Sequence, residues 1–263
     1  MEQRNRGIDL LRMTAMWMVV ILHILNKGGV LAAAAPLSAG QGTARLLETA
    51  AYCAVNCYGL ISGYVGVQRR FRYSGALALW LRVAFYTLGI TAVFACLMPG
   101  SVNGDRVLRA FFPVLFRQYW YVTAYFGMCL FIPFFNLLLT AYTSPTVLLA
   151  AVALVLCFTG LRIGPGFGSF IEKASPLAFS VYLIHAHPLI WEHWLAGRFA
   201  FLADKPPILL ASGVLGGAFA IYLVCSLADV LRAGLFRLFR VKAFSRWAEE
   251  AVSARLRPWL DKE

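Results

Sequence analysis

The sequence has few charged side chains: Asp, Glu, Lys and Arg together make up 14% of its 263 residues. A soluble chain of this length devotes about a quarter of its residues to charge, because its surface must face water. Apolar residues reach 60%, and the mean hydropathy is +0.71. The shortage of charge excludes an ordinary soluble domain and indicates a protein whose surface faces lipid.

Sequence signatures of several enzyme classes and of metal sites are also missing. The chain has no H-E-x-x-H or similar ligand spacing, no G-x-S-x-G and no P-loop, so we expect no metal site. Its six cysteines all lie in apolar runs, where a thiol behaves as a small hydrophobe. We therefore expect no redox role and no disulfide framework.

The charge that is present is mostly basic, with a net of +12, and it is clustered. Lys and Arg gather at Arg4 and Arg6, at Arg69 to Arg72, and from Arg232 to Arg246. Such clusters hold helix ends in the cytoplasm against anionic lipid, whereas a nucleic-acid binder needs a solvated basic face. The expected partner is the bilayer, and no nucleic acid is expected.

Apolar windows long enough to cross a core of roughly 30 Å predict seven membrane spans. They are Ile8–Leu25, Leu46–Val67, Ala76–Met98, Tyr119–Leu139, Thr146–Leu161, Pro176–Leu195 and Ile208–Leu231. Without repeats or linkers, the chain reads as one domain over 1–263: an all-α, polytopic bundle of about seven or eight helices in the cell membrane of a bacterium. The first window predicts a retained helix rather than a signal peptide, because no A-x-A site directly follows Leu25.

Charge and helix count conflict over the C-terminal end. With the N-terminus inside, seven crossings place the basic tail of about 232–263 outside, against the positive-inside rule. The conflict disappears if Val107–Arg117 hides an eighth crossing, if one segment is re-entrant, or if the short fifth window does not cross. We expect both ends of the chain to be cytoplasmic.

The first span keeps three ionisable residues, Asp9, Arg12 and His23. Eleven residues separate Arg12 from His23, which is about 16 Å along a helix and three full circles plus roughly 20°. One face therefore presents a cation near the cytoplasm and an imidazole toward the other side, a spacing that suits acyl-CoA. The alternative is that Arg12 pairs with Asp9 near the interface and that His23 bonds to a loop.

These residues resemble motifs of the integral-membrane acyltransferase family 3, whose members acylate cell-surface and exported glycans. Its basic residue, ten arbitrary residues and histidine match Arg12 and His23. Its SGY-like element and Arg-x-x-Arg match Ser62–Tyr64 and Arg69–Arg72. Its QYWFVTAY and VYLIH stretches match residues 118–125 and 181–185. The chain departs from the family's usual ten or so helices, as though a central group were missing.

The resemblance implies acyl transfer, most simply of acetyl, from cytoplasmic acyl-CoA to a hydroxyl of a surface or lipid-linked glycan. It implies that His23 is the general base and that arginines bind the CoA phosphates; Arg12, Arg69, Arg72 and Arg82 are the candidates. Glu48 opens the second span where His23 closes the first, so it is a candidate to orient the imidazole. Candidates for substrate binding are Gln118, Tyr119, Trp120, Thr123, Tyr125 and His185.

Each assignment has a plainer alternative. Arg69 and Arg72 serve topology in any inside loop, Glu48 serves equally as an interfacial carboxylate, and Tyr119 and its aromatic neighbours fit an interfacial belt. A small-solute transporter or substrate-recognition domain would use the same polar stripe, and a shortened relative without activity is a further alternative.

Overall fold

A computed structural model describes residues 5–66, 73–113, 116, 119, 123 and 145–260. These residues form helices joined by short turns, with no strand among them. The first half contains α1 (Arg6–Asn26), α2 (Val30–Ala33), α3 (Ala39–Ala51), α4 (Ala54–Gly66), α5 (Tyr73–Leu97), η1 (Pro99–Ser101) and α6 (Gly104–Phe111). The second half contains α8 (Pro145–Thr159), α9 (Pro165–Ala174), η2 (Ser175–Leu177), α10 (Ala178–His185), α11 (Pro188–Ile190), η3 (Trp191–Leu195), η4 (Ala200–Leu202), α12 (Pro207–Leu238) and α13 (Val241–Leu260).

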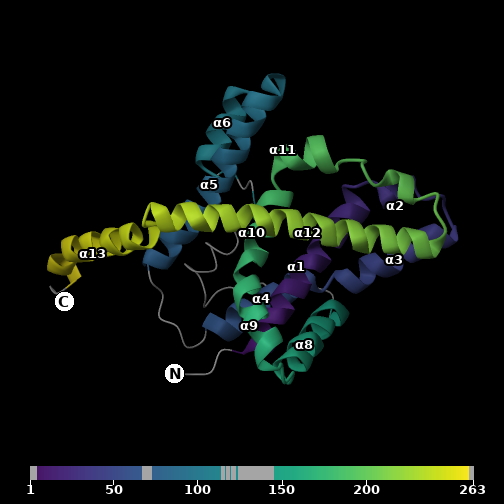
Figure 1. The fold of residues 1–263 in the computed structure, drawn as a ribbon, viewed down its shortest axis with the longest axis horizontal. Coiled ribbons are helices and arrows are strands. Elements are labelled where there is room, and N and C mark those ends of the chain that lie inside the picture. The colour runs from purple at the N-terminus through teal and green to yellow at the C-terminus, as the bar shows by residue number, and fades with distance from the viewer. Residues whose placement is uncertain are drawn as a thin grey trace. The chain divides into compact units, whose positions relative to one another are not determined.

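The chain divides into two compact units. The first comprises Met1–Gln68 with Pro133–Leu227, and the second comprises Arg69–Ile132 with Ala228–Glu263. In the first unit α1 is the central element, because it packs against α3, α4, α8, α9 and α10 (Figure 1). In the second unit α13 packs against α5, and α5 packs against α6.

The start of α1 shows why the central helix can pack so closely. Asn5 caps the helix, since its side chain accepts a hydrogen bond from the backbone N–H of Ile8 at 3.2 Å. A Cβ added at Gly7 would lie 1.7 Å from the carbonyl oxygen of Phe158 in α8, so only glycine fits this crossing. Arg6 joins α1 to α9 through an ion pair with Glu172 at 2.7 Å.

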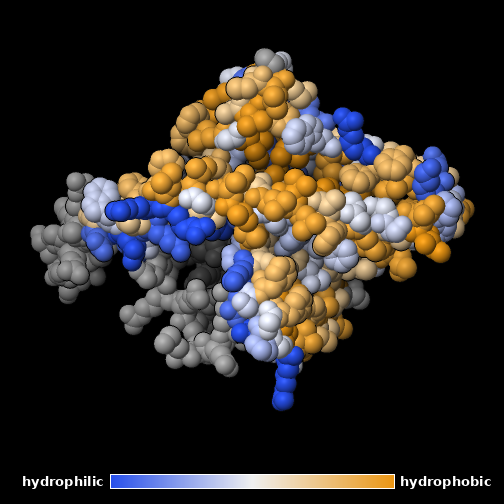
Figure 2. Space-filling view, in the orientation of Figure 1, coloured by the Kyte–Doolittle hydropathy of each residue, from blue (hydrophilic) through white to orange (hydrophobic). Residues whose placement is uncertain are grey.

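Three helical stretches of the described chain are long and apolar enough to cross a membrane: Arg6–Ala33, Leu77–Leu97 and Pro207–Leu238. Figure 2 shows hydrophobic residues along the visible side of α12. Large apolar side chains on this helix are exposed, among them Phe219, Val224, Leu227 and Leu231. A water-facing helix would not carry such a run, so a lipid surface is the environment that fits it.

The structure differs from the predicted spans in two places. Leu46–Val67 is not one helix, because α3 ends at Ala51 and α4 begins at Ala54. Pro176–Leu195 is broken as well: Pro188 has no N–H to continue α10, and His187 before it is extended at φ −64° and ψ 132°. An apolar window measures composition and does not register a turn. The predicted span Tyr119–Leu139 lies almost entirely outside the described residues, and the count of seven or eight spans is not confirmed.

The structure also differs from the prediction at Val107–Arg117 and at the start of the basic tail. The stretch Val107–Arg117, suggested as an eighth crossing, overlaps α6, whose eight residues extend about 12 Å and are by themselves too short to cross. Val114, Leu115 and Arg117 of this stretch lie outside the described residues. Arg232, the first residue of the predicted basic tail, instead lies buried within α12, which continues to Leu238.

Candidate active site

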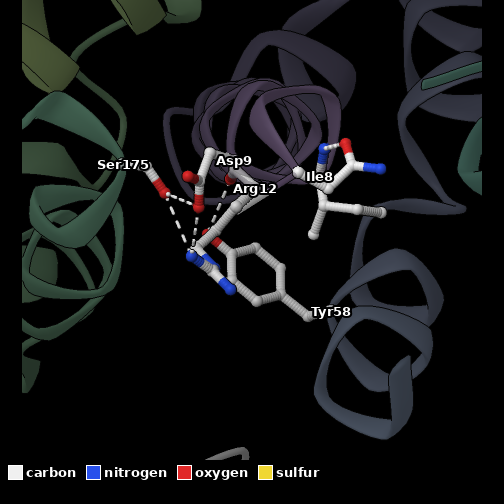
Figure 3. A network of polar contacts seen from close by, with 6 residues as sticks. Ile8, Asp9, Arg12, Tyr58 and Ser175 are labelled. Carbon is white, nitrogen blue, oxygen red and sulfur yellow. Dashed lines mark hydrogen bonds and ion pairs between the residues drawn. The ribbon is translucent and has the colours of Figure 1, made fainter. Parts of the chain in front are cut away.

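Arg12 and Asp9 lie in a polar cluster near the start of α1, which Figure 3 shows at close range. The Nη1 atom of Arg12 donates to Oδ1 of Asp9 and to Oγ of Ser175, both at 3.0 Å. The Ser175 hydroxyl is also 3.0 Å from the same carboxylate oxygen and donates to it. Tyr58 of α4 donates its hydroxyl proton to the backbone oxygen of Arg12 at 2.8 Å. The cluster therefore fastens α1 to η2 and to α4.

The charge of Arg12 is largely compensated in this cluster. Asp9 is 5% exposed, whereas the side chain of Arg12 is 25% exposed. The contacts of the guanidinium with described residues use Nη1, which leaves Nε and Nη2 without a partner among them. Arg12 thus combines a structural ion pair with donors that remain open to an anion.

The opposite end of α1 holds a chain of two imidazoles. Nδ1 of His23 lies 2.7 Å from Nε2 of His185, and Nδ1 of His185 lies 2.5 Å from the backbone oxygen of Val181, one turn earlier in α10. The two rings have centroids 4.8 Å apart and planes inclined at 44°. His185 is 2% exposed, whereas His23 is partly exposed, so the His185 side of the pair is the one closed to solvent.

The backbone carbonyl fixes the protons of both rings when they are neutral. A carbonyl oxygen only accepts, so Nδ1 of His185 carries the proton and Nε2 of His185 has a lone pair. The proton between the rings then belongs to Nδ1 of His23. Consequently Nε2 of His23 is unprotonated, which is the form that a general base requires.

Trp191, the first residue of η3, completes the surroundings of His23. Its ring meets the imidazole edge to face, with centroids 4.8 Å apart and planes at 80°. The ammonium of Lys27 lies 5.3 Å from the centre of the same indole. Trp191 was not a candidate from the sequence, since an aromatic residue in an apolar stretch carries no signal that distinguishes it.

Glu48 is buried at the same end of α1, with three hydrogen-bond partners among the described residues. Its carboxylate accepts from Asn26 at 3.2 Å, from Arg45 at 2.8 Å and from Tyr52 at 3.2 Å. Asn26 follows His23 by one helical turn, while Nδ1 of His23 is bonded to His185 instead. Glu48 therefore reaches the histidine's helix but not its ring, and its catalytic role stays a prediction.

Arg12 and His23 lie on one face of α1, and apolar side chains fill the interval between them. Met16 and Val19, which continue the same face, are buried at 3% and 7% exposure. An extended ligand that touches both ends must therefore run beside these side chains.

The second unit holds another polar group. Arg232 donates to both carboxylate oxygens of Asp229, from Nε at 2.5 Å and from Nη2 at 3.0 Å, and Tyr86 of α5 donates to Oδ1 of Asp229. Arg232 also lies 4.7 Å over the ring of Phe236. Arg82, one turn before Tyr86, is half-buried and has no ion-pair partner in the part of the chain described.

The remaining site candidates fall in or near the region that is not described. Tyr119 is buried at 2% exposure, and its backbone oxygen accepts from the N–H of Thr123 at 3.0 Å. The other five candidates lie outside the described residues: Arg69, Arg72, Gln118, Trp120 and Tyr125.

Sequence reasoning missed Ser175, Tyr58 and the role of His185 as the partner of His23. Substrate binding by His185 stays a prediction; in the structure its ring nitrogens contact His23 and the backbone oxygen of Val181. The sequence gives one local signal for the bond to Val181: His185 ends α10 four residues after Val181, one helical turn away.

Apolar helices and a polar site on a central helix define a helical membrane protein with an internal histidine site. A family model described as acyltransferase domain matches residues 5–172, which is more than half of the chain. The chain belongs to acyltransferase family 3. The matched residues include Arg12, His23 and Glu48 and end before His185 and Trp191. No curated protein and no solved structure matches the chain.

Proposed function

We propose that this membrane acyltransferase moves an acyl group, most simply acetyl, from acyl-CoA to a hydroxyl of a surface or lipid-linked glycan, with His23 as the general base. The observation that carries the proposal is the bond from His23 Nδ1 to His185, because it leaves Nε2 as the free acceptor. Family membership supports acyl transfer as the reaction type.

The reaction follows from this tautomer in two steps. Nε2 of His23 takes the proton of the acceptor hydroxyl while its oxygen bonds to the thioester carbonyl carbon. The tetrahedral intermediate then re-forms the carbonyl and breaks the carbon–sulfur bond, and the CoA thiolate receives the proton from Nε2. The products are an ester and free CoA, and His23 returns to its starting form.

His185 contributes to both steps without touching the substrate. When His23 becomes an imidazolium, the acceptor at Nε2 of His185 still holds its Nδ1 proton, so the ring does not turn during catalysis. Because the carbonyl of Val181 belongs to the backbone of α10, the orientation of the base is set by the fold.

The binding roles of the other candidates belong to the same proposal. Arg12 offers its open guanidinium donors to a CoA phosphate, and arginine suits this role because its planar fork matches phosphate oxygens. We assign CoA contacts also to Arg69, Arg72 and Arg82, and the acceptor path to Gln118, Tyr119, Trp120, Thr123 and Tyr125.

The test uses the purified full chain in lipid nanodiscs with acetyl-CoA as donor. His23→Asn keeps a side-chain N–H at the position of Nδ1 for His185 but has no basic nitrogen at the position of Nε2. We expect release of CoA to fall by about 10²–10⁴-fold, with acetyl-CoA binding retained. His193→Gln, in the neighbouring π-helical turn, is the matched control and should stay close to the parent. Equal rates for His23→Asn and the parent would remove His23 from the mechanism.

A second measurement identifies the acceptor class in cells. The mass of the surface glycan is compared between the parent strain, the deletion strain and a strain with His23→Asn. The proposal expects an acetyl-sized loss in both altered strains. An unchanged glycan together with altered solute uptake would support the transporter instead.

A further inference from the structure

Trp191 carries a buried hydrogen-bond donor that has no acceptor. Its Nε1 is closed to solvent and makes no hydrogen bond in the described protein. A buried tryptophan N–H usually finds a partner, and leaving a buried donor unsatisfied destabilises the folded protein. Such a donor beside a reactive group is explained most directly by an acceptor that a ligand brings.

The position of the indole is set from several sides. The backbone N–H of Trp191 donates to the backbone oxygen of His187 at 2.9 Å. The backbone oxygen of Trp191 accepts from the backbone N–H of Ala196 at 2.8 Å. The second bond spans five residues and gives the π-helical turn η3, a form that is frequent at functional sites. The ammonium of Lys27, at the end of α1, lies over the ring at 5.3 Å.

The backbone after the turn is tied to the two residues that directly follow α1. The N–H of Gly197 donates to the oxygen of Lys27 at 3.0 Å, and that of Phe199 donates to the oxygen of Gly28 at 2.8 Å. The indole and His23 are therefore held by the same short segment, and their edge-to-face contact is a fixed feature of the site. Rigid placement of donors is what transition-state stabilisation requires.

We propose that the Trp191 indole N–H donates a hydrogen bond to the carbonyl oxygen of the acyl thioester and stabilises the oxyanion that forms there. The inference rests on the proposed function, because the oxygen becomes negative only when a hydroxyl deprotonated by His23 attacks the carbonyl carbon. The indole proton stays on nitrogen throughout, and the bond shortens as charge develops and lengthens when the thiolate leaves. The donor is closed to water, so the acceptor that it takes is the carbonyl oxygen that the acyl group brings.

Substitution by phenylalanine separates this role from packing. Trp191→Phe keeps an aromatic ring against His23 and removes the N–H. We expect kcat to fall about 10²-fold while KM for acetyl-CoA changes less than about threefold. The thermal midpoint should not fall, because the variant loses an unsatisfied buried donor. If Trp191 has only a structural role, the thermal midpoint and the activity should fall together.

Two matched controls are available in the chain. Trp194→Phe alters the same π-helical turn at a residue that is 57% exposed. Trp17→Phe removes another buried indole N–H that lacks a partner, in α1 but away from the face of Arg12 and His23. Both controls should keep kcat within about threefold of the parent. A loss at Trp17→Phe equal to that at Trp191→Phe would overturn the assignment.

A spectroscopic readout keeps the inference separate from the proposed function. Infrared difference spectra are recorded for acetyl-CoA, isotope-labelled at the thioester carbonyl, bound to His23→Asn, in which turnover is blocked. We expect the carbonyl stretch to lie below that of free acetyl-CoA and to return toward the free value when Trp191→Phe is added. An unchanged stretch, or no bound acetyl-CoA, would overturn the proposal for Trp191. Transfer that persists in His23→Asn would instead overturn the general base.

Discussion

The two ends of α1 show different uses of polar side chains within one helix. At the Arg12 end, Nη1 of the guanidinium, the Asp9 carboxylate and the Ser175 hydroxyl hydrogen-bond to one another and join α1 to η2. At the His23 end, His23 donates to His185 and His185 donates to a backbone carbonyl, which leaves a free lone pair on Nε2 of His23. The first end joins helices, whereas the second ends in a group that can react.

The comparison also bears on how much an ionisable residue in a membrane helix indicates. Charge in an apolar helix is costly, so it is usually taken as functional. Here Asp9 removes much of that cost for Arg12, and a structural explanation accounts for most of its contacts. His23 gains no ion pair in the described protein, and its contacts are those that select a tautomer.

The largest expected effect beyond loss of His23 itself comes from His185. His185→Phe removes the acceptor for Nδ1 of His23, so the tautomer with a free Nε2 is no longer selected. We expect kcat to fall by about 10²–10³-fold, with KM for acetyl-CoA nearly unchanged. His185→Gln, which offers an oxygen near the position of Nε2, should recover part of the loss. A Phe variant with more than about a tenth of the parent kcat would show that the ring pair is packing alone.

Much of the arrangement of α1 could be predicted from the sequence, because it depends on helical geometry. The shared face of Arg12 and His23 follows from a spacing of eleven residues, and the helix itself follows from its apolar run. The partner of His23 could not be predicted in this way. The sequence offers Glu48 as a candidate because it opens the second predicted span on the side where His23 closes the first. His185 is 162 residues away from His23 and meets it through the packing of α10 on α1.

The helix breaks were also beyond a count of apolar residues. Pro188 ends the continuity of the predicted span 176–195, and a window of summed hydropathy does not weigh one proline. The break was nonetheless visible in principle, because the residue before a proline avoids the helical region. This break places Trp191 in a separate turn beside His23 rather than further along α10.

The Arg12 end predicts opposite effects for two neighbouring substitutions. Arg12→Gln should raise KM for acetyl-CoA about tenfold, because a charged donor to phosphate is lost. Asp9→Asn should lower KM by about threefold, since it frees the guanidinium from its counter-ion in a partly exposed setting. Both variants should lose about 1–3 kcal/mol of stability, because each breaks the cluster.

The measurement for this pair is the salt dependence of KM in nanodiscs of neutral lipid. Added salt should reduce the difference between the two variants, because it screens the attraction of Arg12 for phosphate. If both substitutions shift KM in the same direction, the Arg12 end is a structural joint and takes no part in donor binding.

Substitution of Glu48 should have a smaller effect, and it tests whether this carboxylate is structural or takes part in the reaction. Glu48→Gln keeps the shape of the side chain but weakens its bonds with Arg45 and Asn26, so we expect a loss of about 1–2 kcal/mol in unfolding free energy. The kcat should stay within about threefold of the parent, because the ring of His23 is oriented by His185. A fall in kcat as large as that of His185→Phe would place Glu48 in the reaction.

The smallest effect is expected at Tyr58, whose hydroxyl bonds to the backbone oxygen of Arg12. Tyr58→Phe removes one neutral hydrogen bond between α4 and α1, so thermal or denaturant unfolding should show a loss of about 0.5–1.5 kcal/mol. The guanidinium keeps its contacts with Asp9 and Ser175, and KM should therefore be unchanged. Because the lost bond involves the backbone of Arg12 and not its charge, a changed KM would show that the position of the helix itself, rather than the ion pair, sets the affinity for the donor.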